Sequence, residues 1–218
     1  MTVDLTIARA RCVREQIEAR GVRDPKVLAA MLAVPRELFV PDELRDLTYD
    51  DGPLPIAAEQ TISQPFIVAF MAEALALEGG EKVLEIGAGS GYAAAVLSKI
   101  AAEVFTVERI GELARIAIEN LAKAGCNNVH VRHADGTEGW REAAPFDAIL
   151  VSAGAPDVPK SLQNQLAIGG RLVIPVGRSM RSQILLRVTR TGKNEFKRDD
   201  LGGVRFVPLV GKEGWEND

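Results

Sequence analysis

The segment that most constrains how this chain can fold is the run KVLEIGAGSGY at residues 82–92. An apolar stretch rich in strand formers, interrupted by Glu85, precedes glycines at the alternate positions 87, 89 and 91, and an alanine-rich helical stretch follows. A strand, a tight glycine turn and a helix form the unit that opens nucleotide-binding α/β domains. Glycine lets a ligand lie against the main chain, where the first amides of the helix can bind it. An ordinary strand-to-helix turn is the alternative, but three alternate glycines exceed what such a turn needs.

The spacing of these glycines disfavours a nicotinamide dinucleotide as the ligand. A dinucleotide fingerprint would place its third glycine at position 92, which is Tyr92 here. The G-x-G-x-G pattern, with Glu85 inside the strand, resembles motif I of the class I S-adenosylmethionine-dependent methyltransferases. Their cofactor carries no phosphate, so its site needs close backbone approach and a carboxylate for the ribose or the amino group. The candidates for these contacts are Glu85, Gly87, Gly89, Ser90 and Gly91.

Composition excludes several other classes of function. A chain of 218 residues with 47% hydrophobic residues can bury a core without staples, and its net charge of −4 gives no sign of nucleic-acid or membrane binding. Cys12 and Cys126 form no C-x-x-C pair, so we expect reduced thiols. His130 and His133 have no cysteines nearby and would make a poor zinc pair, so we expect no metal. Without an apolar leader or a membrane-length apolar run, the expected location is the cytoplasm. A monomer is expected as well.

Strands and helices are expected to alternate after residue 80, which predicts a mostly parallel sheet with helices on both faces. Residues 1–48 are expected to form a helical N-terminal extension, with a helix over 4–20 and another that begins at the Asp24–Pro25 cap. Residues 49–66 hold three prolines and little periodicity, and are expected to be a long functional loop. Helices are expected over 67–77, 112–124 and 159–166, the last ended by glycines 169 and 170. Strands are expected at 103–107, 128–132, 146–152 and 171–175, in a hairpin of 183–191 with 194–197, and at 204–210.

Candidate ligand-binding side chains follow the strands of this expected sheet. Ligands bind open α/β sheets beyond the carboxyl ends of the strands. Glu108 is placed to accept both ribose hydroxyls of a nucleoside, although a surface ion pair with Arg109 would also explain it. Asp135 beside Gly136 could bind the exocyclic amine of adenine or simply form a turn, and the small residues 152–156 leave space or make a tight connection. No lysine stands at these positions, which favours the adenosine of S-adenosylmethionine over a nucleoside triphosphate.

The whole chain resembles the protein-L-isoaspartate O-methyltransferases, which repair damaged aspartyl and asparaginyl sites in aged proteins. The glycine motif alone indicates only a methyltransferase, whereas TISQP and RFVPL are much narrower signals. The resemblance implies a doubly wound, mostly parallel seven-stranded α/β sheet of the Rossmann-like methyltransferase type, in one domain over 1–218 whose core and C-terminal substrate segment span 80–218. The matching segments are VPRELFVP (34–41), PLPI (53–56), QTISQPFIVAFM (60–71), VLEIGAGSGY (83–92), VFTVER (104–109), ADGTEGW (134–140), PFDAILVSAGAP (145–156), GGRLVIPVG (169–177) and VRFVPLVG (204–211).

The resemblance also implies roles for particular residues. In the family, the serine of T-I-S-x-P contacts the reacting carboxyl group, which makes Ser63 the catalytic candidate here. The flanking cofactor-site candidates are Gln60, Thr61, Ile62, Ser63, Glu108, Arg109, Asp135 and Gly136. The substrate-site candidates are Ser63, Arg205, Phe206, Val207, Pro208, Leu209 and Val210. The chain departs from the family pattern at residues 57–59, Ala-Ala-Glu, where members usually carry glycine and uncharged residues, so that Glu59 adds a negative charge. It departs again at Ala88, where threonine is frequent.

The activity implied is methyl transfer from S-adenosyl-L-methionine to the α-carboxylate of L-isoaspartyl residues in proteins and peptides. The products are S-adenosyl-L-homocysteine and an ester that can close to a succinimide. Three alternatives stay open from the sequence: a class I methyltransferase for a small molecule or RNA, an NAD-dependent oxidoreductase, and a cofactor-binding module without catalysis. TISQP weighs against the first and Tyr92 against the second, while the third would not need the polar groups that the chain keeps.

Overall fold

The strand that precedes the glycine turn lies at the centre of the molecule. The computed structural model describes residues 4–179 and 182–216, and Lys82–Ile86 form β3, whose last four residues are buried. Successive side chains of a strand point to opposite faces of a sheet. Val83 accordingly belongs to one hydrophobic cluster, and Leu84 and Ile86 belong to a second cluster on the other face. A strand buried on both faces is typical of the middle of a parallel sheet.

The main sheet has seven strands in the order β5-β4-β3-β6-β7-β8-β9. The first five strands are parallel neighbours, and β8 runs antiparallel to both β7 and β9. The chain leaves β3 toward β4 on one side and returns to pair β6 on the other, so the carboxyl end of β3 is a topological switch point. This arrangement confirms the expected fold class. The other strands are β4 (Glu103–Glu108), β5 (Val129–His133), β6 (Phe146–Val151), β7 (Leu166–Ser179), β8 (Ser182–Arg190) and β9 (Phe196–Val204).

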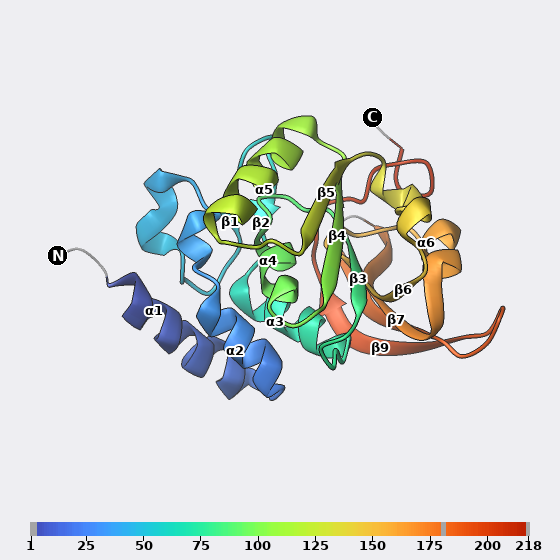
Figure 1. Cartoon of the computed structure of the whole chain (residues 1–218), viewed down its shortest axis with the longest axis horizontal. Coiled ribbons are helices and arrows are strands. Elements are labelled where there is room, and N and C mark those ends of the chain that lie inside the picture. Colours follow the sequence, from blue (N-terminus) through green and yellow to red (C-terminus); the bar gives the residue numbers. More distant parts are fainter. Residues whose placement is uncertain (1–3, 180–181, 217–218) are drawn as a thin grey trace.

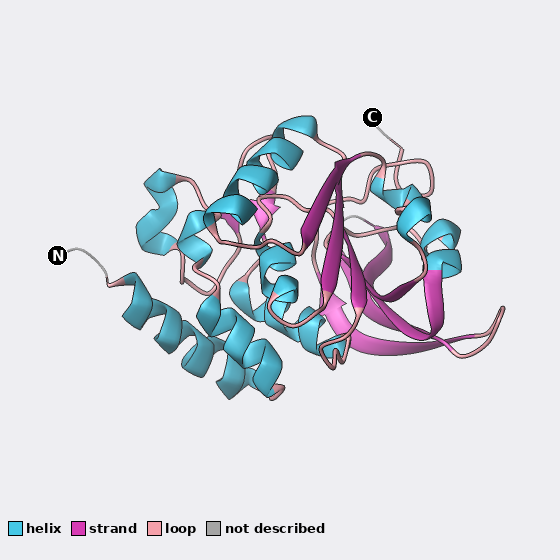
Figure 2. Ribbon diagram, viewed as in Figure 1, coloured by secondary structure: helices cyan, strands magenta, loops and turns pink. Residues whose placement is uncertain are grey.

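Helices cover both faces of this sheet (Figures 1 and 2). The larger cluster joins one face of the sheet to α1 through α5, and the smaller one joins the other face to Leu162 of α6. No helix in the described part of the chain is long and apolar enough to cross a membrane. The helices are α1 (Leu5–Cys12), α2 (Pro25–Ala33), α3 (Pro65–Ala74), α4 (Tyr92–Ser98), α5 (Gly111–Lys123) and α6 (Lys160–Gln165).

The N-terminal extension packs against the helix that follows the glycine turn. Helical structure continues from α1 through a wide turn at Val13–Ile17 and a tight one at Glu18–Arg20, so the helix expected over 4–20 is confirmed with a change of pitch. The expected cap is also confirmed, because the Asp24 carboxylate accepts a hydrogen bond of 2.8 Å from the amide of Lys26. The extension is joined to α4 by an edge-on contact between Phe39 and Tyr92, whose ring centres are 5.6 Å apart.

The segment expected to be an irregular loop contains a small hairpin. β1 (Leu54–Pro55) pairs antiparallel with β2 (Thr61–Ile62), and residues 56–60 make the turn. Ala58 and Glu59 have φ values of 54° and 56° in this turn, in the left-handed region that favours glycine. That backbone explains why glycine suits this place in the family. Strands of two residues carry no periodicity, so sequence patterning could not find them.

Two expectations for the C-terminal third need correction. The strand expected at 204–210 is wrong, because β9 already ends at Val204 and the chain continues irregularly. Pro208 has no amide to donate, and the neighbouring chain is the loop after β6, so only single bridges form; one is the bond from the Leu209 amide to the Gly154 carbonyl. β7 begins at Leu166, not at 171, so glycines 169 and 170 lie inside a strand. The expected hairpin is confirmed, with β9 extending to Val204.

Candidate active site

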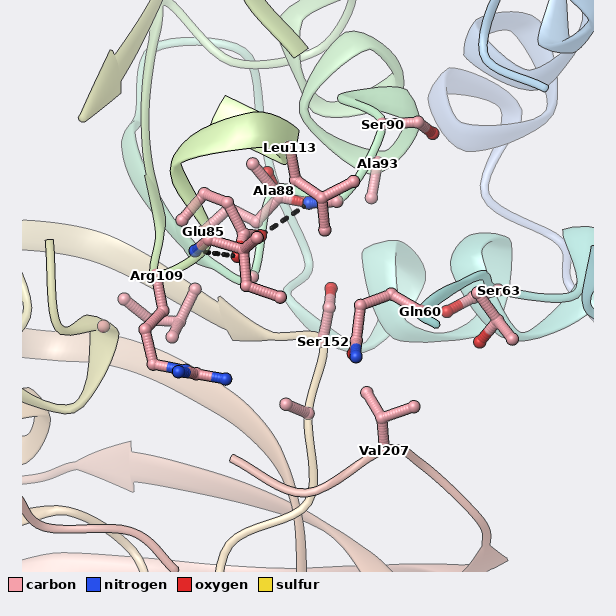
Figure 3. A pocket seen from close by; sticks show the side chains of 18 of the residues that line it. Gln60, Ser63, Glu85, Ala88, Ser90, Ala93, Arg109, Leu113, Ser152 and Val207 are labelled. Carbon is pink, nitrogen blue, oxygen red and sulfur yellow. Dashed lines mark hydrogen bonds between the residues drawn. The ribbon is translucent and has the colours of Figure 1, made fainter. Parts of the chain in front are cut away.

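A cavity lies at the carboxyl ends of the central strands, where the topology predicts a ligand (Figure 3). The space between its walls, counted out into the open mouth, is about 830 Å³. Figure 3 shows Glu85, Ala88 and Leu113 grouped on one side of the cavity, with Gln60, Ser152 and Val207 on another. The lining residues that the sequence predicted are Gln60, Thr61, Ile62, Ser63, Glu85, Gly87, Gly89, Ser90, Glu108, Arg109, Gly136, Val207, Pro208, Leu209 and Val210.

The glycine turn is held between the two strands that flank β3. The amide of Gly87 donates to the carbonyl of Val107, and the amide of Ser152 donates to that of Ile86, both at 2.8 Å. Gly91 does not line the cavity, and a Cβ there would lie 3.2 Å from the Leu121 side chain of α5. The φ of 93° and the close packing of α4 on α5 together explain why position 91 is a glycine. Its predicted contact with the cofactor stays a prediction.

Glu108 is fixed at the end of β4 by backbone amides. One carboxylate oxygen accepts from the amide of Gly89 and the other from the amide of Ile110, each at 2.9 Å. No ion pair joins it to Arg109 within the described residues, so the surface-pair interpretation of this carboxylate is wrong. Glu108 is nearly buried at the cavity wall, and each oxygen keeps a lone pair. It can therefore accept two neighbouring hydroxyl groups of a ribose.

Glu85 lies deeper, and no part of it is exposed to solvent. One carboxyl oxygen accepts a hydrogen bond of 2.6 Å from the Thr106 hydroxyl, while the other has no partner within the described residues. Burial raises the pKa of Glu85 to about 8, and the nearby charge of Glu108 acts in the same direction, although the Thr106 bond opposes it. Glu85 therefore has one oxygen available to a polar group of a ligand.

The residues of this cavity fit S-adenosylmethionine. Two buried polar atoms of its wall, an oxygen of Glu85 and the Ser90 hydroxyl, lack a partner within the described chain, and a polar ligand would satisfy such atoms. The acidic lining residues are Glu85 and Glu108, whose oxygens can accept hydrogen bonds from the hydroxyl and ammonium groups of such a ligand. No lysine is among the described lining residues, as the sequence analysis expected for a ligand without phosphates.

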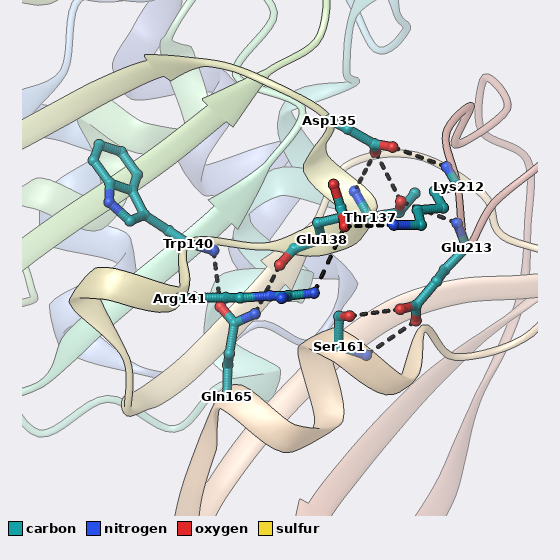
Figure 4. Close-up of polar contacts among 9 residues, drawn as sticks. All are labelled: Asp135, Thr137, Glu138, Trp140, Arg141, Ser161, Gln165, Lys212 and Glu213. Atoms are coloured by element: carbon teal, nitrogen blue, oxygen red, sulfur yellow. Dashed lines mark hydrogen bonds and ion pairs between the residues drawn. The ribbon is translucent and has the colours of Figure 1, made fainter.

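Asp135 serves the C-terminal segment instead of lining this cavity (Figure 4). One of its oxygens accepts from the amide and the hydroxyl of Thr137, and the other accepts from the amide of Lys212 at 2.8 Å. Glu213 completes the contact, because its amide donates to the Thr137 hydroxyl and its carboxylate accepts from Ser161. Three protein donors thus occupy the carboxylate that the sequence assigned to adenine, whereas Gly136 does line the cavity.

The C-terminal candidates divide between this cavity and a second one beside it. Residues 207–210 line the first cavity, while Arg205 and Phe206 line only the second. Ser63 and Ser152 line both, so they lie where the two cavities meet. Ser152 was not among the predicted site residues, although its place directly after β6 could have indicated it. Glu59 is exposed and lines neither cavity.

A switch-point cavity with a glycine turn, a ribose-type carboxylate and no lysine defines a class I S-adenosylmethionine-dependent methyltransferase. Comparison with known families agrees with that class and narrows it. A family model described as protein-L-isoaspartate(D-aspartate) O-methyltransferase (PCMT) matches residues 8–214. The chain belongs to this family, which decides against an oxidoreductase and against a module without catalysis.

Individual relatives span nearly the whole chain. A protein-L-isoaspartate O-methyltransferase of Rhodopseudomonas palustris is 62% identical over 204 residues, which are 94% of each chain. One of Syntrophotalea carbinolica is 56% identical over 216 residues, 99% of each chain. A solved protein-L-isoaspartate O-methyltransferase superposes with a TM-score of 0.86 at 30% identity, over 94% of this chain and 67% of the other. A Plasmodium falciparum structure in complex with S-adenosyl-L-homocysteine superposes at 0.79 and 26% identity, over 92% and 97%.

Proposed function

We propose that this chain transfers a methyl group from S-adenosyl-L-methionine to the α-carboxylate of L-isoaspartyl residues in proteins and peptides. The observation that carries this proposal is the composition of the cavity wall where Ser63 and Ser152 meet. No histidine, lysine or cysteine is among its described lining residues. A carboxylate nucleophile with a pKa of about 4 is already ionised at pH 7 and needs no base. Acceptors that must lose a proton would require a base, and the carboxyl groups in this wall are Glu85, which is fully buried, and Glu108, which is bonded to two backbone amides.

Orientation is the main task that this leaves to the protein. S-adenosylmethionine would supply an electrophilic methyl group, and Glu108 and the glycine turn are the parts of the chain that would hold this cofactor. Ser63 is placed to orient one oxygen of the substrate carboxylate, and the hairpin that carries it forms part of the cavity wall. Holding reacting groups in line supplies on the order of 7–11 kcal/mol. Excluding water from the cavity strengthens every electrostatic contact inside it.

The second cavity gives the substrate chain a place to lie. It opens beside Ser63 and is walled by the end of β9 and the residues that follow it. Residues 205–210 run there without regular strand pairing. The Gln183 side chain bonds both backbone groups of Phe206, and the Gly154 loop bonds the Val207 carbonyl and the Leu209 amide, so a peptide would meet mainly the side chains of this segment. A peptide whose free α-carboxylate lies where the two cavities meet would extend along this second cavity. Because the site is open on that side, it can accept chains as well as short peptides.

A labelled-methyl assay tests the proposal. An isoaspartyl peptide and its normal aspartyl twin are incubated with the protein and labelled cofactor, and the label on each peptide is counted. We expect label on the isoaspartyl peptide alone, because only there is the α-carboxylate free. The main chain of that peptide runs through the side-chain carbonyl, whereas in the aspartyl twin the α-carbonyl is part of the peptide bond. Equal labelling of the twins, or none of either, would overturn the proposal.

We also propose a reducing, cytoplasmic location for the protein. Cys12 and Cys126 are separate buried thiols, as is usual where thiols stay reduced. Burial raises the pKa of Cys12 to about 11, which makes that thiol unreactive. The monomeric state and the lack of a nucleic-acid partner stay predictions from the sequence.

A further inference from the structure

The second cavity has a volume of about 1430 Å³ out to its open mouth. It is continuous with the cofactor cavity, because both are lined by Thr61, Ser63, Ser152, Val207 and Pro208. Its remaining walls come from distant parts of the chain, namely the end of the N-terminal helical segment, the start of α3 and the end of β9. A substrate whose carboxylate reaches Ser63 would therefore place its neighbouring residues against these walls.

The charge on these walls has a single sign. Arg20 and Arg205 are the charged residues among the described lining of the second cavity, and both are cationic. Arg205 is exposed and makes no ion pair with any described residue. Both arginines can therefore act on a charged group of a bound peptide, at a distance from the carboxylate that reacts.

Arg20 is held in one orientation before any substrate binds. Its guanidinium carbon lies 3.7 Å from the centre of the Phe66 ring, a stacked cation–π contact. One terminal nitrogen, Nη1, donates to both oxygens of Asp51 at 3.1 and 3.3 Å, and Asp51 is fixed in turn by the Gln64 amide at 2.6 Å. The side chain stays 41% exposed. Stacking and pairing together remove rotamer freedom that a peptide would otherwise have to restrict on binding.

One edge of this guanidinium is left for a ligand. Nε and Nη2 of Arg20 have no hydrogen-bond partner in residues 4–179 and 182–216. Those two nitrogens present parallel N–H groups, which match the two oxygens of a carboxylate. Asp51 offsets part of the charge but does not occupy this edge. The Phe66 ring beneath it keeps water from one face of the pair that would form.

We propose that Arg20 selects substrates with an acidic side chain next to the isoaspartyl residue, with Arg205 adding to the attraction from the same cavity. The inference rests on the proposed function, since it names the substrate class of that same site. Asparagine and aspartate sites with a flanking glutamate or aspartate would then be methylated at lower concentration than sites with a flanking lysine.

The test is a set of isoaspartyl peptides that differ at one flanking residue. Glutamate, glutamine and lysine are placed in turn before the isoaspartyl residue in one series and after it in another. In at least one series, we expect the KM for the glutamate peptide to be roughly three- to tenfold below that for its glutamine twin, with lysine higher still. The ratio should shrink toward one at 0.5 M salt, because the side chain is partly exposed.

Variants of the protein assign the effect to the residue. Arg20→Gln should raise the KM for the glutamate peptide and bring the glutamate-to-glutamine ratio close to one, while Arg20→Lys should keep only part of the preference, because lysine cannot pair through two parallel N–H groups. Arg14→Gln is the matched control, since Arg14 lies on the same segment, is exposed and lines neither cavity. A calorimetric titration with cofactor checks that each variant is folded, and Arg205→Gln tests the charge if Arg20→Gln does not fold.

The failures of the two proposals are distinguishable. Methylation of no peptide in either series would overturn the proposed function itself. Methylation of all peptides with equal KM values in the unaltered protein would leave that function standing and overturn the acidic preference. If Arg14→Gln removes the acidic preference as fully as Arg20→Gln does, the preference comes from the overall charge of the protein, and the role of Arg20 is overturned.

Discussion

At the scale of single residues, Ser63 carries the sharpest expectation for catalysis. Ser63 lines both cavities, and its hydroxyl makes no hydrogen bond within the described chain, so it is available to a substrate. We expect Ser63→Ala to lower kcat roughly ten- to a hundredfold, since a misoriented carboxylate reacts slowly. The affinity for S-adenosylmethionine should stay nearly unchanged. Steady-state kinetics and a calorimetric cofactor titration check both expectations.

Ser63→Thr is the matched variant for that measurement. It keeps a hydroxyl on the same carbon and should recover most of the lost turnover. A large loss of cofactor affinity in Ser63→Ala would contradict the orienting role and assign the serine to the cofactor.

Glu85 makes stability depend on pH. Its pKa is about 8 in the folded protein against 4.5 in an unfolded chain, so between these values the folded state holds a proton that the unfolded state releases. The stabilisation is fully present below pH 4.5 and is lost as pH rises through 8, with a slope of up to about 1.4 kcal/mol per pH unit. Urea titrations from pH 5 to 8 should show this loss in the unaltered protein and a flatter profile in Glu85→Gln.

Glu43→Gln removes the same charge from an exposed position and should leave the pH profile of the unaltered protein unchanged. If Glu85→Gln follows that profile as well, the buried carboxyl is ionised at neutral pH, and the argument from burial fails.

The sequence could predict which residue types stand at the site but not how their hydrogen bonds are shared. Glu108 and Asp135 carry the same kind of group at equivalent strand ends, and both were expected to face adenosine. Only the structure shows that the Asp135 carboxylate accepts three protein donors, one of them from Lys212, 77 residues along the chain. A partner that distant leaves no local pattern, so sequence reasoning could not separate the two carboxylates.

At the scale of elements, the C-terminal segment depends on side-chain ties in place of strand pairing. Thr137 is fully buried; its hydroxyl donates to Asp135 and accepts from the amide of Glu213. Thr137→Val keeps the shape of the side chain and removes both bonds, at a cost of about 1–3 kcal/mol for the unpaired groups. We expect faster amide exchange over 209–215 and a higher KM for peptide, with a smaller change in cofactor affinity.

Thr191→Val, at the exposed turn between β8 and β9, is the control for that substitution and should change none of these quantities. Unchanged exchange over 209–215 in Thr137→Val would mean that the single bridges to the Gly154 loop are enough to hold the segment.

Hydrophobic periodicity predicted the helices and strands that are long enough to show a repeating pattern. β3 through β6 and α5 lie within a residue or two of their expected bounds. The hairpin β1–β2 was missed because strands of two residues carry no periodicity. The strand expected at 204–210 proved irregular because its neighbour is a distant loop and Pro208 has no amide to donate. The strand order at the β7–β8–β9 edge likewise depends on contacts that no local pattern records.

At the scale of the whole molecule, one hydrophobic cluster joins the N-terminal extension to the sheet. It includes Ile17 and Phe39 of the extension together with Val83 and Leu185 of the sheet. A cluster that crosses the boundary near residue 48 predicts that residues 1–218 unfold as one cooperative unit. The division into extension, loop and core would then describe position in the chain and not independent stability.

Phe39→Ala tests that cooperativity. Phe39 is 1% exposed and contacts Tyr92 at the start of α4, so its removal should cost about 3–5 kcal/mol. Trp140 packs on the opposite face of the sheet, and the other tryptophan, Trp215, donates to the Gly154 carbonyl of the loop after β6. Tryptophan fluorescence therefore reports on parts of the molecule outside the extension, while far-ultraviolet circular dichroism follows the helices. We expect the urea midpoints by both probes to coincide and to fall together in Phe39→Ala. Leu47→Ala, at an exposed leucine of the same extension, should move neither. A dichroism transition that shifts alone, ahead of fluorescence, would mean that the extension unfolds separately, and the expected single domain would be wrong.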